Sequence, residues 1–270
     1  MNAARHSLSS AELTSLREPL PLARLLRAYL MEAKVETLAA LRTVSFAPPF
    51  VILPPAIYFL FGVVIFGSGA ADADPAVADW LFASFAAMGA MMPGIFGGTI
   101  LATEREGRLT MLKRALPQPP GASIIAKMLT AMLISAIAVI LVAIVALIAQ
   151  KITLSPVQVG IVCTMLIAGS IPFTAIGLLI GACTSTSASI AWSNLVFLPM
   201  LWLSGLFIPL PAFLKSWVVI WPAFHLNQLA LGAAGVAKFT FIPPAMAFAV
   251  LAGVTVLFGG LAMRRLARVG

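Results

Sequence analysis

The residues with most to offer chemically lie in one charged run, Glu104 to Pro117, between two long apolar segments. Charges are costly in hydrocarbon, so this run must lie in water at one face of a membrane. Gly107 and Pro117 can end helices, and three leucines share one face of the helix between them: Leu109, Leu112 and Leu116. The run predicts a short amphipathic helix over 105–116 that docks on another protein. Lys113 lies off the leucine face, and we expect it to matter little for docking.

Catalytic chemistry is missing from the apolar segments. None of them holds Asp, Glu or His at its centre, whereas an enzyme needs a positioned acid, base or metal ligand. His225 is the only histidine beyond the N-terminal tail, and we interpret it as a polar residue at the membrane interface. The sequence has no G-x-x-x-x-G-K-[ST] loop, so we do not expect it to bind or hydrolyse ATP. We expect no catalytic residue, no metal and no cofactor on this chain.

Composition places the chain in a membrane. Of its 270 residues, 61% are apolar and 10% are charged, against about 25% charged residues in soluble domains. The net charge of +8 arises from basic residues at the ends of apolar segments, where they face anionic lipid headgroups. We therefore expect contact with membrane lipid and not with nucleic acid.

Two parts follow from the pattern along the chain. Residues 1–43 predict a polar tail and an amphipathic helix in the plane of the membrane interface, with an ordinary solvated helix as the alternative. Residues 44–270 predict an all-α transmembrane domain, because six apolar segments reach the roughly 20 residues that cross a bilayer. The expected spans are 44–66, 79–101, 124–149, 159–182, 190–209 and 241–263. Several contain proline, which neighbouring helices must compensate by binding the freed backbone groups.

Charge distribution predicts the orientation. The N-terminal region, the segment between spans two and three, and the C-terminal tail hold 14 of the 17 Lys and Arg residues. Because basic loops stay inside, both termini are expected in the cytoplasm. The chain is then a multi-pass protein of the bacterial inner, or cytoplasmic, membrane.

Two further groups could serve a function. Trp217 and Trp221, with flanking prolines, predict short helices over 210–240 that dip into the outer interface; a plain aromatic anchor is the alternative. The most polar group inside a span consists of Trp192, Ser193 and Asn194. This group either bridges helices by hydrogen bonds or contacts a substrate.

In order and spacing, these features resemble the membrane subunits of ABC-2 type exporters. The run Glu104-Arg105-Glu106-Gly107-Arg108-Leu109, followed by Leu112 and Leu116, is similar to the family's E-R-E-x-G-T-L stretch. The residues Ser204, Gly205 and Pro209 are similar to its S-G-x-x-x-P signature at the outer end of span five, and Trp217 and Trp221 fall in its outer re-entrant segment. Arg108 departs from the pattern, since the family usually has Thr there.

The resemblance implies a function and partners. A cytoplasmic ABC ATPase dimer, carrying ATP and Mg, would bind the coupling helix, and two permease chains would pair as a homodimer or heterodimer. The complex would export a hydrophobic or amphiphilic cargo, such as a drug, a lipid or a glycolipid or polysaccharide. The alternatives are a membrane enzyme acting on lipids and a non-transporting scaffold or immunity-type protein.

Overall fold

The computed structural model describes residues 22–43, 46–66, 74–115, 121–149, 152–207 and 217–269. Within these ranges every regular element is a helix. In chain order they are α2 (Leu22–Arg42), α3 (Ala47–Tyr58), the π-helix η1 (Phe59–Ile65), α5 (Pro75–Glu106), α6 (Leu109–Ala115), α7 (Ala122–Ala149), α8 (Pro156–Ala168), α9 (Ile171–Cys183), α10 (Thr186–Leu203), the 3-10 turn η3 (Val218–Ile220), α11 (Pro222–Ala234), the 3-10 turn η4 (Ala237–Phe239) and α12 (Pro244–Val269).

Six stretches of the described chain are long and apolar enough to cross a membrane, which confirms the all-α six-span architecture. They are Ala47–Ile65, Pro75–Glu106, Ala122–Ala149, Pro156–Cys183, Thr186–Leu203 and Pro244–Arg268. The second extends beyond the predicted 79–101, so Glu104, Arg105 and Glu106 form the last turn of a spanning helix. They do not belong to a separate short helix.

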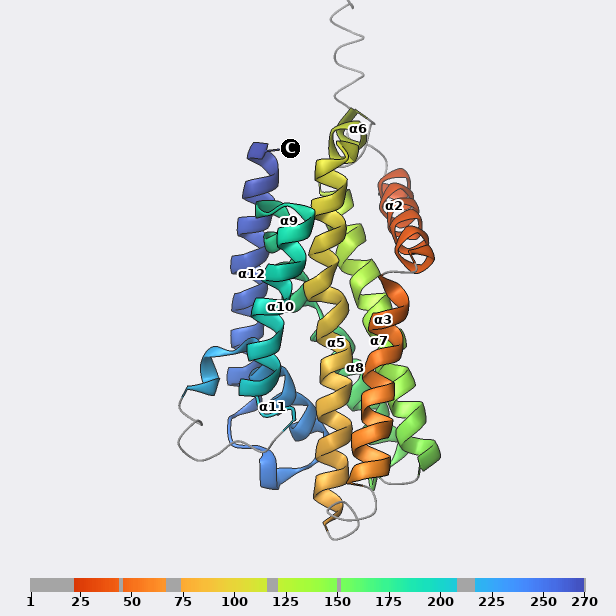
Figure 1. Ribbon diagram of the computed structural model, residues 1–270, viewed down its shortest axis with the longest axis vertical. Helices are drawn as coiled ribbons and strands as arrows, with labels where there is room; N and C mark the ends of the chain where they lie inside the picture. The colour runs from red at the N-terminus through yellow and green to blue at the C-terminus, as the bar shows by residue number, and fades with distance from the viewer. Residues whose placement is uncertain are drawn as a thin grey trace, which may run out of the picture.

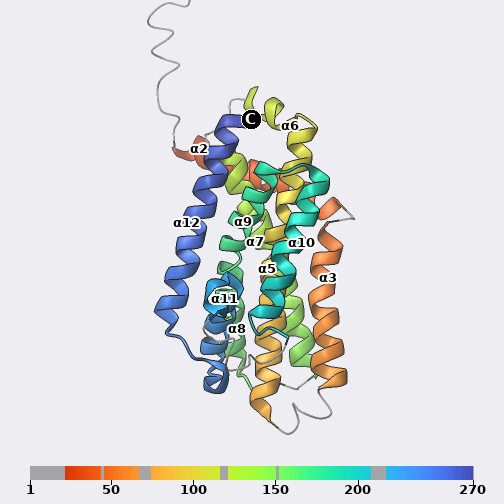
Figure 2. The same cartoon turned by 60° about the vertical axis from the view of Figure 1, so that its left-hand side comes forward.

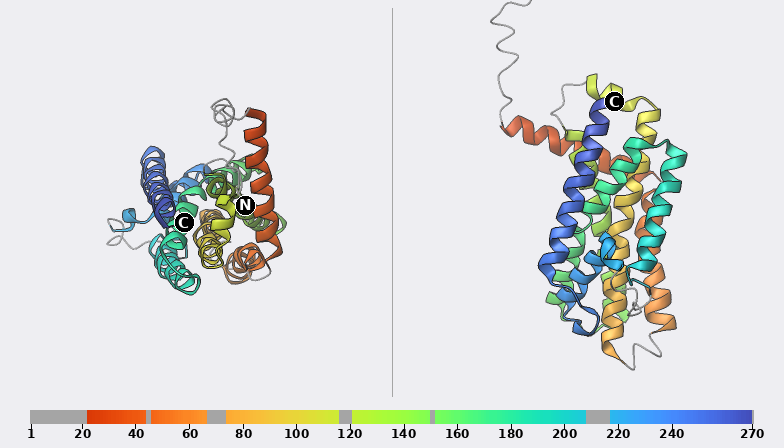
Figure 3. Two further views of the ribbon diagram at one scale, coloured as in Figure 1. Left: turned by 90° about the horizontal axis from the view of Figure 1, so that it is seen from above. Right: turned by 90° about the vertical axis from the view of Figure 1, so that its left-hand side faces the viewer.

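The spans stand roughly parallel, whereas α2 lies across them at one end of the bundle (Figures 1 and 3). The helix α6 and the C-terminal end of α12 lie at this same end, and α11 lies in the opposite half (Figure 1). The crosswise orientation of α2 is that of an interfacial helix.

Local chemistry explains where several helices begin. Asp74 caps α5 by accepting a hydrogen bond from the Ala76 amide at 3.0 Å, and Ser155 forms a capping box with Gln158 at the start of α8. Span four divides into α8 and α9 just before Pro172, which lies in the first turn of α9. Proline fits there because it has no amide hydrogen to contribute.

The centre of the bundle is the contact between α5 and α9. Gly94 and Gly98 on α5 face Gly177 and Gly181 on α9, so each helix presents a G-x-x-x-G pair to the other. A Cβ on Gly98 would lie 1.8 Å from the carbonyl oxygen of Gly177, and one on Gly181 would lie 2.0 Å from that of Gly98. Only glycine allows the two backbones to approach this closely.

Pro93 lies inside α5 without ending it, and neighbouring helices bind backbone carbonyls close to it. Ser135 of α7 donates to the Ala90 carbonyl at 2.9 Å, and Ser193 of α10 donates to the Ile95 carbonyl at 3.3 Å. Both residues are fully buried. Side chains from two spans therefore hold α5 on either side of the proline.

The segment after span five contains a helix packed among the spans. The helix α11 contacts α5, α8 and α12. His225 is completely buried and bonds the Val219 carbonyl through Nε2 at 2.8 Å. Gln228 binds the backbone on both sides of Thr240, donating to the Phe239 carbonyl and accepting from the Phe241 amide. Backbone groups outside α11 thus bind two of its buried polar side chains.

Candidate functional site: a charged cluster beside an exposed helix

The junction between α5 and α6 is a sharp turn. The helix α5 ends at Glu106, Gly107 follows, and α6 begins at Leu109. The left-handed position of the turn falls on Arg108, with φ of 57°, and not on Gly107. A residue with a Cβ is strained there by about 1–2 kcal/mol relative to a right-handed conformation. The turn separates the span from the short helix at its end.

The short helix α6 presents apolar side chains to its surroundings. Leu109 is 48% exposed, Met111 58% and Leu112 65%. Leu116, predicted to join this face, lies outside the described residues. An exposed apolar face at the end of a membrane domain, next to charged residues, has the character of a protein contact surface.

The helix α6 is tied down by Lys113, which lies one helical turn after Leu109. Its Nζ lies 3.3 Å from Oε1 of Glu32 and 3.5 Å from Oε1 of Glu104, and it also pairs with Oε1 of Glu36. Lys113 therefore joins α6 to α2 and to the end of α5. Three carboxylates converge on this one ammonium group, so Lys113 holds the helix in place, while its small role in docking stays a prediction.

A second lysine completes the cluster from α7. Nζ of Lys127 lies 3.0 Å from Glu36 and 2.8 Å from Glu104, so both carboxylates are shared between the two lysines. The Lys127 and Glu36 side chains are only 8% and 6% exposed. Buried charges are tolerated only when each has close partners. Four helices thus meet in one cluster of five charged residues: Glu32, Glu36, Glu104, Lys113 and Lys127.

The cluster holds Glu36 and Lys113 in their charged forms. Burial alone raises the pKa of Glu36, but Lys127 and Lys113 outweigh this and bring the pKa below its usual value of 4.5. Burial alone lowers the pKa of Lys113, but the hydrogen bond that it donates to Glu36 and the charges of Glu104, Glu36 and Glu32 raise the pKa above its usual value. The ion pair between Glu36 and Lys113 therefore persists across neutral pH.

Arg105 and Glu106 contact α9 and α10, with Arg105 half-buried and Glu106 exposed. Nη1 of Arg105 donates to the carbonyl oxygens of Gly181 at 2.7 Å and Thr184 at 3.3 Å, at the C-terminal end of α9. A cation at this position satisfies the free carbonyls of a helix end. Glu106 accepts a hydrogen bond from the Thr186 hydroxyl in the first turn of α10. Most charged residues of the run therefore contact neighbouring helices, and the leucines of α6 form its outward apolar surface.

The turn after span five is partly described. Gly205 has a φ of 74°, which favours glycine, and Ser204 is buried beside it. Both line a cavity of about 20 Å³ with Asn227 and Gln228 of α11. Trp217 is 77% exposed and Trp221 is half-buried against the core, so only Trp217 has the exposure of an interfacial anchor. Pro209 lies outside the described residues.

The polar group of span five does not act as one unit. Ser193 is buried and bridges to α5 through the Ile95 carbonyl. Asn194 is half-buried and donates to the Ile190 carbonyl of its own helix at 3.0 Å, and Trp192 is 51% exposed. Ser193 therefore bridges two helices, which was one of the two expected roles.

Sequence reasoning missed Glu32, Glu36 and Lys127 as members of the site. The signals were present: Glu32 and Glu36 share a face of α2 at i and i+4, and Lys127 lies within an otherwise apolar span. An ionisable residue in such a segment needs a partner.

Comparison with protein-family models adds an independent observation. The model of the family described as ABC-2 type transporter matches residues 33–241, more than three quarters of the chain. The match begins within α2 and includes α6, α11 and every member of the charged cluster except Glu32. No curated protein matches the chain significantly.

Proposed function

Because the chain belongs to the ABC-2 type transporter family, we propose that it is the membrane subunit of an ATP-driven exporter. A separate ATPase binds ATP and Mg and docks on α6. The observation that carries this proposal is that α6 combines exposed leucines with an anchored lysine. Leu109 and Leu112 are exposed at the end of the bundle, while Lys113 ties the helix to α2 and α5.

Such a helix is suited to transmitting motion. A partner that encloses Leu109 and Leu112 moves α6 as a unit, because amphipathic helices bind partner grooves through their apolar face. Lys113 passes that displacement to α2 and α5, and Lys127 extends the connection to α7. Arg105 connects the same end of α5 to α9. One push on α6 therefore reaches four other helices.

The orientation follows from the same end of the molecule. Basic residues concentrate on α2, the α5–α6 junction and the last turns of α12, where they favour the cytoplasm. Lys238, at the other end, pairs with Asp74 across an exposed surface. In the proposed orientation, α6 lies where a cytoplasmic ATPase can reach it, and α11 lies towards the outside of a bacterial inner membrane.

A second permease chain fits the face formed by α3, α5 and α10. These helices stand next to one another in Figure 2, and α3 and α10 are only sparsely covered by the rest of the chain. Large apolar side chains lie exposed there, including Phe59, Leu195 and Trp202. We propose that two chains meet across this face around a path for hydrophobic or amphiphilic cargo.

The test is the composition of the complex purified from the native host. A tagged full-length chain is extracted in mild detergent and its mass is measured under native conditions. Two permease chains with two chains of an ATPase carrying a nucleotide-binding loop are expected. A transport-competent complex with one permease, or with no ATPase, contradicts the proposal.

A further inference from the structure

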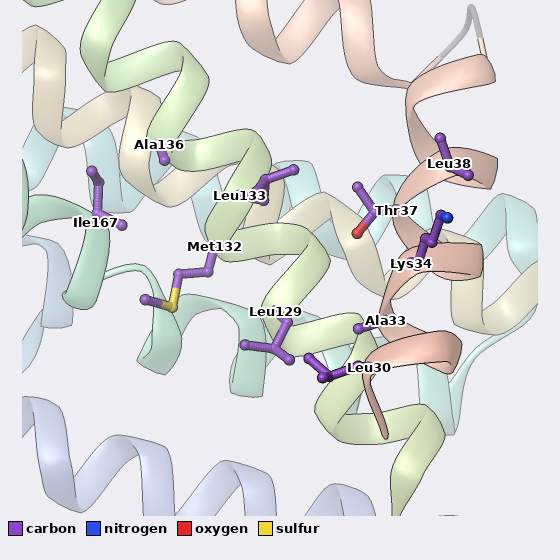
Figure 4. Close-up of a pocket in the computed structure, with 10 residues that line it drawn as sticks. All are labelled: Leu30, Ala33, Lys34, Thr37, Leu38, Leu129, Met132, Leu133, Ala136 and Ile167. Carbon is purple, nitrogen blue, oxygen red and sulfur yellow. The ribbon is translucent and has the colours of Figure 1, made fainter. Parts of the chain in front are cut away.

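A groove lies between α2 and α7, outside the charged cluster. The groove has a volume of about 550 Å³, and Figure 4 shows the residues that line it. Its walls are almost entirely apolar, and Leu129, Leu133 and Ala136 of α7 form its floor between α2 and Ile167 of α8. Nothing in the coupling role of α6 requires this space.

The groove has a defined depth relative to the membrane interface. Glu36 pairs with Lys127, which fixes α2 against the first turns of α7. The floor residues lie two to nine positions further along α7, or about 3–14 Å at the helical rise of 1.5 Å per residue. The groove therefore starts at the level of a charged, interfacial helix and extends into the hydrocarbon region.

One cation lines the groove, and its environment differs from that of the cluster lysines. Lys34 is exposed on the wall formed by α2, and no ion pair joins it to a carboxylate among the residues described. The other polar group of the lining, the hydroxyl of Thr37, already bonds the Thr130 hydroxyl at 3.0 Å. Lys34 is thus a charge available to an anion beside a surface suited to a hydrocarbon chain.

We propose that this groove binds an anionic phospholipid of the leaflet in which α2 lies. Its phosphate accepts hydrogen bonds from the Lys34 ammonium group, and one acyl chain lies along Leu129, Leu133 and Ala136. A phospholipid matches both Lys34 and the apolar floor. It carries a negative headgroup at one end and an acyl chain behind it, and the groove offers a lysine and then an apolar floor in the same order. The bound lipid fills the space under α2 and steadies the helix that carries Glu32 and Glu36. The site is independent of the cargo.

The experiment uses the purified full chain and a phosphatidylglycerol with a photoactivatable group in its acyl chain. After illumination, mass spectrometry of the digested protein locates the attached lipid. Attachment is expected in the segment that contains Leu129 to Ala136, and the same label on phosphatidylcholine should give markedly less. Attachment spread evenly over the exposed faces of α10 and α12, or equal labelling by both lipids, overturns the proposal.

Two pairs of variants separate the chain contact from the charge contact. Ala136→Trp fills the groove and should abolish attachment, whereas Ile148→Trp, on an exposed position of the same helix outside the groove, should leave it intact. Lys34→Gln should reduce the preference for phosphatidylglycerol about fivefold, the effect of one basic residue at an anionic surface. Arg24→Gln, on α2 but outside the groove lining, should not. Unchanged labelling in both Ala136→Trp and Lys34→Gln overturns the proposal.

Discussion

The contacts of α5 with α9 and of α2 with its neighbours use opposite chemistry. Between α5 and α9, glycines bring two backbones together with no side chain between them. Between α2, α6, α7 and the end of α5, five long charged side chains form the connection. A backbone contact has almost no alternative arrangement, whereas ion pairs can exchange partners with small side-chain rotations. The difference indicates a rigid core and a deformable joint.

The position of each contact agrees with this division. The glycine pairs lie inside the bundle, where a mobile polar contact would be left without water. The helices that carry the charged cluster meet where α2 crosses the bundle, next to α6 (Figure 1). The leucines of α6 are exposed. In an exporter of the proposed kind, the ATPase exerts force on α6. The deformable charged cluster therefore lies next to the helix that receives the force.

Breaking the rigid contact should have the largest effect. Gly98→Ala places a Cβ against the Gly177 carbonyl, and a backbone atom cannot rotate away. We expect the free energy of unfolding in detergent to fall by about 3 kcal/mol or more. The adjacent Gly97→Ala is the matched control, because its Cβ meets no atom within 4 Å, and it should change stability by less than about 1 kcal/mol. Similar behaviour of the two variants would show that the α5–α9 contact is not tightly packed.

Removing a charge from the cluster should have the next largest effect. Lys127→Met leaves Glu36 and Glu104 with only Lys113 as a cation, so we expect a loss of about 2–3 kcal/mol. Lys238→Met breaks an ion pair whose side chains are 60% and 36% exposed, and it should cost no more than about 0.5 kcal/mol. Equal losses in the same unfolding assay would mean that burial does not distinguish the two lysines.

Acid should weaken the cluster and leave the glycine contact unaffected. The folded-state pKa of Glu36 is below its usual value of 4.5, so its stabilisation is present above about pH 4.5 and is lost as the pH falls through the lower, folded-state pKa. Glu36→Gln should show a shallower decline in unfolding free energy over that interval than the parent protein. A decline that is identical in both proteins assigns the acid sensitivity to other groups.

A smaller effect is expected at the turn between the span and α6. Arg108→Gly removes the strain of a left-handed residue with a Cβ, offset in part by the greater flexibility of glycine in the unfolded chain. We expect stabilisation of about 0.5 kcal/mol. Destabilisation of the purified protein would show that the Arg108 side chain contributes a contact that exceeds the strain.

The sequence predicts the spans well because their signal is local. About 20 consecutive apolar residues suffice to identify a span, and α2 is recognised by its own periodicity. Pro172 likewise marks the division of span four within a few residues.

The cluster is harder to predict because its partners are distant in sequence. Lys113 meets Glu36 across 77 positions and Lys127 meets the same residue across 91, so helical periodicity within either segment cannot pair them. The burial of α11 was missed for a similar reason. The side-chain amide of Gln228 hydrogen-bonds to backbone groups 11 to 13 residues later. In the sequence alone, the polar residues of α11 suggest an exposed surface.

The central claim is that α6 receives the ATPase through its exposed leucines and passes motion to the bundle through Lys113. The most direct measurement is the amount of ATPase that co-purifies with Leu112→Asp, at matched membrane levels. Leu112 is 65% exposed, so the permease should fold and insert normally, while binding should weaken about tenfold or more. The control Ser187→Asp adds the same charge at an exposed site in the first turn of α10 and should retain the ATPase. Full retention of the ATPase by Leu112→Asp would contradict docking on α6.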